Sequence, residues 1–157
     1  MFGGLALKAT PVHAVLADFR SWASSYMRQG RVIDWQQNAI SHSEGQGWGL
    51  LLAQAAGDRE AFEQIEAWTA TNLAVREDRL MAWSRKPEDG QIDWRNATDG
   101  DLFRAWALLR AGRDSVWPGH IDTALAIARD IAAHCLVPDP PCPGRAIAGS
   151  RCRGSAR

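Results

Sequence analysis

The stretch SEGQGWGLLLAQAAGDREAF, residues 43–62, contains one helix, its end and the start of another. Its first part is apolar nearly all round, which is typical of a helix buried in a core. Ser43 is the predicted N-cap, with Gln46 reaching back as a capping box, and Gly57 ends the helix. Asp58 then caps a helix with a single apolar stripe that runs to Leu73.

Three further segments have helical spacing. Apolar residues repeat every three or four positions from 12 to 27, where Thr10-Pro11 supplies a start and Gly30 a stop, and again over 98–112 and 121–135. Residues 80–97 break the pattern around a turn at 87–90, which predicts a hairpin or a long loop. Helices that alternate between buried and one-faced predict an all-α fold with inner and outer layers, a toroid or a solenoid.

The composition excludes several classes of protein. The 157 residues carry 18 basic and 18 acidic side chains, so the excess of positive charge that nucleic-acid binding needs is missing. No run approaches the roughly 20 apolar residues of a membrane span. The three cysteines imply neither a disulfide framework nor a zinc site, and we expect no metal and no cofactor. Eight Trp stand against one Tyr; we expect any single Trp to be a core residue, but the set as a whole favours a protein that stacks on sugar rings.

Acidic residues stand at the starts of two predicted helices, Glu44 and Asp99. A lone carboxylate there is usually a cap that favours the helix dipole. Here glycines flank both acids, and glycine costs helix stability, so we expect space for a ligand. If both helices begin at the same end, the two carboxylates share a cleft with Trp48, Trp83 and Trp94. Paired carboxylates lined by aromatic rings suit glycoside hydrolysis, and an apolar neighbour such as Trp48 is expected to raise the pKa of Glu44.

Three segments resemble the bacterial cellulases of glycoside hydrolase family 8, especially the endoglucanases that accompany cellulose synthesis. They are GRVID at 30–34, the stretch at 43–62, and ATDGDLFRAWALLRAGR at 97–113. The resemblance implies an (α/α)6 toroid, here incomplete with about five helices, that holds a β-1,4-glucan in an open groove. It makes Glu44 the proton donor and Asp99 the second signature acid. It also implies substrate-binding residues: Asp34, Gln46, Trp48, Trp83 and Asp101, the last of which orients the Asp99 loop or is simply a helix-terminal charge.

The resemblance also implies an inverting, endo-acting cellulase whose general base lies in a later Tyr-Asp-Ala-type motif. No such motif occurs in this sequence, so we expect impaired hydrolysis. We expect residues 1–137 to be the N-terminal part of the catalytic domain. Residues 138–157, rich in Pro, Arg and Gly, are expected to form a disordered tail translated out of frame.

Other interpretations stay open. One alternative is a non-catalytic glucan-binding or cellulose-synthesis accessory protein, and another is a purely structural helical domain. The resemblance favours a secreted or periplasmic location and a link to the cellulose synthase machinery, although the N-terminus is not a convincing signal peptide. The sequence leaves open which β-glycan is preferred.

Overall fold

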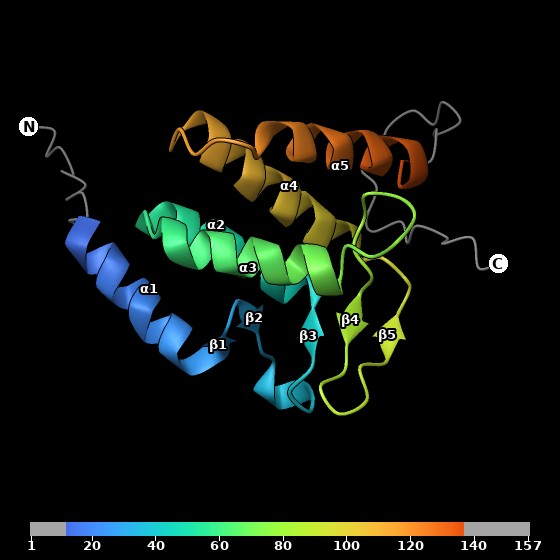
Figure 1. Cartoon of the computed structure of the whole chain (residues 1–157), viewed down its shortest axis with the longest axis horizontal. Coiled ribbons are helices and arrows are strands. Elements are labelled where there is room, and N and C mark those ends of the chain that lie inside the picture. The colour runs from blue at the N-terminus through green and yellow to red at the C-terminus, as the bar shows by residue number, and fades with distance from the viewer. Residues whose placement is uncertain (1–11, 137–157) are drawn as a thin grey trace, which may run out of the picture.

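The computed structural model describes residues 12–136, which form five α-helices, a short 3-10 helix and five two-residue strands (Figure 1). In chain order these are α1 (Val12–Tyr26), β1 (Met27–Arg28), β2 (Arg31–Val32), η1 (Trp35–Gln37), β3 (Ser41–His42), α2 (Ser43–Ala56), α3 (Arg59–Asn72), β4 (Ser84–Arg85), β5 (Ile92–Asp93), α4 (Thr98–Arg113) and α5 (Ile121–His134). The start predicted at Thr10-Pro11 and the tail predicted over 138–157 lie outside the described residues.

The helices pack in two layers, as their apolar patterns predict. Helices α2 and α4 lie against each other, and α1 and α3 pack on α2 while α5 packs on α4 (Figure 1). The core between them contains Leu50, Phe62, Ile65, Leu108 and Ile127, all at most 1% exposed. Helices α2 and α4 form the inner layer. Glu44 and Asp99 lie in their first turns, so a site shared by these two acids would lie at the N-terminal ends of both helices.

Two glycines let the inner helices approach closely. A Cβ atom on Gly47 would lie 2.7 Å from the Cβ atom of Phe103, and one on Gly100 would lie 2.6 Å from Ser43 Oγ. Real Cβ atoms do not come this close, so both positions need glycine. The contact between Gly100 and Ser43 places the first turns of α4 and α2 side by side.

Most predicted helix boundaries are confirmed, but two details are wrong. Helix α2 is capped by His42, whose side chain accepts a hydrogen bond from the Gly45 N–H, and not by Ser43. Helix α1 ends at Tyr26, so Gly30 does not stop it and instead lies, at φ 79°, in the turn of the β1–β2 hairpin. Strands of two residues are too short to show a period in the sequence.

The hairpin predicted within residues 80–97 is confirmed, and it is part of a larger unit. Strand β4 pairs with β5, with Ser84 opposite Asp93, and also with β3, with His42 opposite Ser84. This three-stranded antiparallel sheet ties the hairpin to the residue that precedes α2 (Figure 1). No helix between residues 12 and 136 combines the length and the apolar character that crossing a bilayer requires.

Candidate active site

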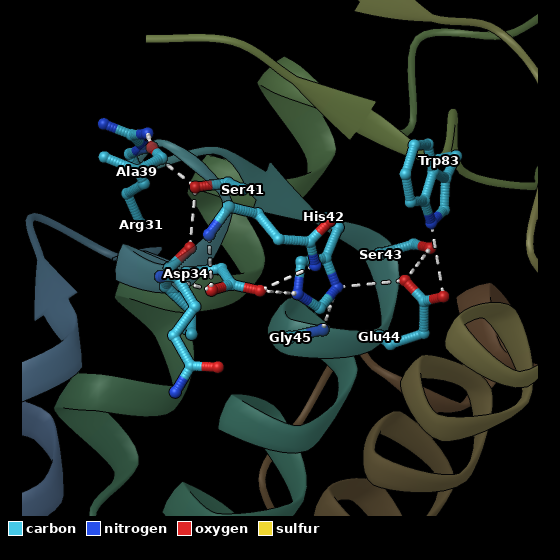
Figure 2. A network of polar contacts seen from close by, with 12 residues as sticks. Arg31, Asp34, Ala39, Ser41, His42, Ser43, Glu44, Gly45 and Trp83 are labelled. Carbon is cyan, nitrogen blue, oxygen red and sulfur yellow. Dashed lines mark hydrogen bonds and ion pairs between the residues drawn. The ribbon is translucent and has the colours of Figure 1, made fainter.

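Glu44 lies in the first turn of α2 and is held by hydrogen bonds on three sides (Figure 2). Its Oε1 accepts from the Trp83 indole N–H at 3.3 Å, and its Oε2 accepts from the Ser43 hydroxyl at 3.1 Å. The His42 Nδ1 atom lies 3.0 Å from the same Oε2. These contacts fix a half-buried carboxyl group in one orientation at the end of an inner helix.

The prediction that an apolar neighbour raises the pKa of Glu44 is wrong. Burial alone does raise that pKa, but the hydrogen bond to His42, the peptide N–H of Glu44 itself, the charge of His42 and the Ser43 hydroxyl lower it. The net result is a Glu44 pKa below its ordinary value. The His42 pKa is raised, chiefly by the hydrogen bond to Glu44, so the two groups favour an ion pair.

Asp99 lies in the first turn of α4 with an exposed side chain. One of its oxygens accepts a hydrogen bond from the N–H of Gly100, the residue that packs on Ser43. Gly100 and Ser43 are in direct contact. Asp99 is next in sequence to Gly100, and Glu44 is next to Ser43. The expectation that both helices begin at the same end holds for these residues, and the two acids belong to one region of the surface.

Two hollows are lined by hydrogen-bond partners of Glu44. The first, about 390 Å³, is lined by Trp22, Tyr26, Val32, Ile33, Asp34, Trp35, Gln36, His42, Gly45 and Trp48. The second, about 410 Å³, is lined by Ile40, Trp83, Ser84, Lys86, Gln91, Ile92, Asp93 and Trp94. Glu44 is bonded to His42, which lines the first hollow, and to Trp83, which lines the second. Both volumes fall in the range of small-molecule sites.

Exposed indole rings line both hollows. Trp35 and Trp48 are 53% and 50% exposed in the first, and Trp94 is 56% exposed in the second. The Trp48 ring packs on Phe103 of α4, with 4.6 Å between the ring centroids, so it is held against the inner helices while one face stays open. Such rings offer the flat apolar surface on which sugar rings stack.

Asp34 caps η1 and lines the first hollow. Its side chain accepts hydrogen bonds from the Gln36 and Gln37 N–H groups, and its Oδ2 lies 3.3 Å from His42 Nε2. Burial raises the pKa of Asp34, but these hydrogen bonds and the charge of His42 lower it overall. Asp34 is thus within reach of a ligand in the hollow and also touches the imidazole.

Gln46 is fully buried, which corrects its prediction as a substrate-binding residue. Its amide donates to the Gly30 carbonyl at 3.2 Å and to Thr69 Oγ1 at 2.8 Å, and its Oε1 accepts from the Val32 N–H. A surface-bound glucan does not reach this side chain. Gln46 instead joins α2 to α3 and to the β1–β2 hairpin.

Asp101 is also fully buried, so it binds no substrate directly. It accepts a hydrogen bond from the Met81 N–H at 2.7 Å and one from the Asn96 amide at 3.3 Å. Met81 stands two residues before Trp83, whose carbonyl accepts from the Ser43 N–H. Asp101 therefore fixes the segment that presents the Trp83 indole to Glu44.

Burial is the main cause that raises the pKa of Asp101, from 3.8 to about 6. Because the folded-state pKa is raised, the stability that this carboxyl contributes is complete below about pH 4 and is lost as the pH rises through 6. We expect the loss to be about 3 kcal/mol, and Asp101→Asn to remove it. Urea unfolding of both proteins at pH 4, 5.5 and 7 measures the difference, and parallel pH curves would contradict the assignment.

The sequence interpretation missed His42, which touches both Asp34 and Glu44. A histidine two residues before a predicted acid is the available signal, but only the N-cap geometry turns its ring toward the carboxylates. Among the described residues, no group of three or more His, Cys, Asp or Glu side chains is arranged to hold a metal ion.

Comparison with known proteins gives a consistent picture. The family model described as glycosyl hydrolases family 8 matches residues 4–148. A probable endoglucanase from Novacetimonas hansenii is 40% identical over 121 residues, which are 75% of this chain and 35% of that protein. An endoglucanase from Cellulomonas uda is 40% identical over 109 residues, 62% of this chain and 30% of that protein. The chain thus spans about a third of the length of these curated relatives.

Solved structures show the same likeness. The endo-beta-1,4-glucanase CMCax from Acetobacter xylinum superimposes with a TM-score of 0.72 at 40% identity, over 78% of this chain and 39% of that one. The endoglucanase Cel10 from Klebsiella pneumoniae gives a TM-score of 0.72 at 34% identity, over 75% and 39%. With the two helical layers, this likeness confirms the predicted incomplete (α/α)6 toroid.

Proposed function

The chain belongs to glycosyl hydrolase family 8, and from that premise we propose that it hydrolyses internal bonds of β-1,4-glucan with Glu44 as the proton donor. One observation supports this most: a fixed carboxyl group is bonded to a residue of each of two hollows with exposed indoles, and the acid of a second helix lies in the same region. A glucan chain that crosses Glu44 would place one sugar ring in each hollow.

Glycosidic bond cleavage needs a proton on the leaving oxygen and negative charge near the sugar ring as it becomes cationic. Glu44 is the candidate for the proton donor, because burial and its hydrogen-bond partners set its pKa. Asp99, exposed and next to Gly100, supplies the charge and holds the distorted ring. We propose an inverting course in which a separate base activates water on the opposite side of the ring.

That base is the part of the scheme for which this sequence has no candidate motif. The one tyrosine, Tyr26, is followed by Met27, so a Tyr-Asp motif does not occur in the 157 residues. General base catalysis contributes about 10²–10⁴-fold in rate, and we therefore propose that hydrolysis by this chain is slow by about that factor.

The substrate class follows from the shape and lining of the hollows. Flat indole faces suit the equatorial glucose rings of cellulose, and the polar edges, Asp34 and Gln36 on one side and Lys86 and Gln91 on the other, suit their hydroxyl groups. Such a polymer occurs outside the cytoplasm, and we propose that the protein works there, beside the machinery that makes cellulose.

A second candidate function is glucan binding without cleavage. The lowered pKa of Glu44 favours it, because this pKa favours an ionised carboxylate over the acid that cleavage needs. In that case the indoles provide the affinity, and Trp48→Ala weakens binding more than Glu44→Gln.

Two measurements on the whole chain separate these functions. Incubation with carboxymethylcellulose is expected to lower the viscosity before many reducing ends appear, since internal bonds are cut first. Titration with cellotetraose is expected to quench the fluorescence of the exposed Trp residues. Quenching with unchanged viscosity would establish the binding protein, and the absence of both effects would reject every glucan-directed function.

A further inference from the structure

His42 bridges the two carboxylates of the site. Its Nε2 lies 3.3 Å from Asp34 Oδ2, and its Nδ1 lies 3.0 Å from Glu44 Oε2 (Figure 2). Only about a fifth of the imidazole side chain is exposed. Arg31, on the neighbouring strand β2, is bonded to Ser41 and Ala39, so the charged groups facing the ring are the two acids. We call Asp34, His42 and Glu44 the carboxylate–imidazole chain.

The contacts of Nδ1 describe two protonation states. Nδ1 also lies 3.1 Å from the Gly45 nitrogen, whose N–H can only donate. When Nδ1 carries a proton, it donates to the Glu44 carboxylate and cannot accept from Gly45. When Nδ1 has none, its single lone pair can accept either from the Gly45 N–H or from the O–H of a neutral Glu44. The helix cap and the hydrogen bond from a neutral Glu44 therefore both need an Nδ1 atom without a proton.

This pairing resolves a conflict in the proposed function. A general acid must hold a proton, yet the surroundings of Glu44 lower its pKa and raise that of His42. Both directions favour a proton on the imidazole, which is one hydrogen bond from where catalysis needs it. A sugar over the site excludes water, and loss of water disfavours two opposite charges relative to two neutral groups.

Resting on the proposed function, we propose that His42 is the positioning residue that stores the catalytic proton and passes it to Glu44 when a glucan binds. In this step the Nδ1–H bond breaks and a Glu44 O–H bond forms, so the imidazolium and the carboxylate both become neutral. The remaining Nε2–H donates to Asp34, which selects that tautomer. Glu44 then gives the proton to the leaving oxygen, and the proton that the attacking water releases returns through solvent to His42.

The first test is an NMR titration of the imidazole nitrogens in the whole chain. Glu44→Gln is expected to lower the titration midpoint of His42 by about one pH unit or more, because an opposite charge in contact is lost. His120 serves as an internal control, since its ring pairs with Glu63 outside the site. Equal midpoints for His42 in both proteins would overturn the proposal.

The second test adds cellotetraose near pH 6. In the wild-type chain His42 is expected to become neutral, while the nitrogen signals of His120 are expected not to change. In Glu44→Gln the sugar is expected to leave His42 charged, because no group is there to take the proton. Bound sugar with a still-protonated His42 in the wild type would reject the transfer.

Hydrolysis gives the third measurement. His42→Gln keeps a hydrogen-bonding side chain that does not titrate, and it is expected to move the alkaline limb of the kcat/KM profile to lower pH by about one unit or more. A purely structural role would lower activity equally at every pH. If the wild type neither binds nor cleaves glucan, the proposed function fails and the transfer with it, whereas cleavage with an unmoved limb rejects the transfer alone.

Discussion

Glu44→Gln is expected to lower kcat for carboxymethylcellulose by about 10²–10⁴-fold, the contribution of general acid catalysis. The amide fills the same space, and its oxygen can still accept from the Trp83 indole while its NH2 group donates to the Ser43 hydroxyl oxygen. It cannot deliver a proton. Fluorescence titration with cellotetraose should therefore give a dissociation constant close to that of the wild type, so the loss lies in kcat.

A substrate that needs no proton provides the control. With a dinitrophenyl cellobioside, whose leaving group departs unprotonated, the loss caused by Glu44→Gln should be far smaller. Asp99→Asn should slow both substrates, because its charge acts on the sugar ring and not on the leaving group. If Glu44→Gln slowed both substrates equally, Glu44 would not be the acid.

Gly30→Ala is expected to give the largest loss of stability, about 2–5 kcal/mol. Gly30 has φ 79°, and a Cβ atom there would lie 2.0 Å from the Gln64 carbonyl oxygen and 2.5 Å from its carbon. The obstacle is backbone, so it cannot rotate away. The hairpin would have to leave α3, and the Gln46 amide would lose its Gly30 carbonyl partner.

Gly57→Ala is the matched control. Gly57 has a similar φ of 72° at the end of α2, but no atom lies within 4 Å of its missing Cβ. Gly57→Ala should therefore lower the free energy of unfolding only by the cost of a positive φ at alanine, about 1–2 kcal/mol. Urea unfolding of the three proteins measures both values, and equal losses for the two variants would show that the close approach at Gly30 is not rigid.

The helices were predictable because periodicity and caps are local signals. Asp58 caps α3 as expected, and α2 ends at Gly57 with φ 72°. The sequence could not predict that His42 caps α2 in place of Ser43, since both are polar and adjacent. Ser43 is excluded because it is buried against Gly100, a contact between residues far apart in the chain.

The site was only partly predictable, for a related reason. Glu44 and Asp99 were identified by type and position, but their common end depends on how α2 and α4 pack. Gln46 and Asp101 look like ligand-binding residues in the sequence, and the structure buries both with hydrogen-bond partners. Polarity alone does not distinguish a buried, satisfied side chain from one that meets a substrate.

The most direct test of the account is a crystal structure of the Glu44→Gln chain with cellotetraose. We predict sugar rings in both hollows, on Trp48 and on Trp94, with a glycosidic oxygen about 3 Å from the side chain at position 44 and the Asp99 carboxylate against the same sugar. A cellotetraose bound elsewhere, or one that touches neither of these two positions, would contradict the account.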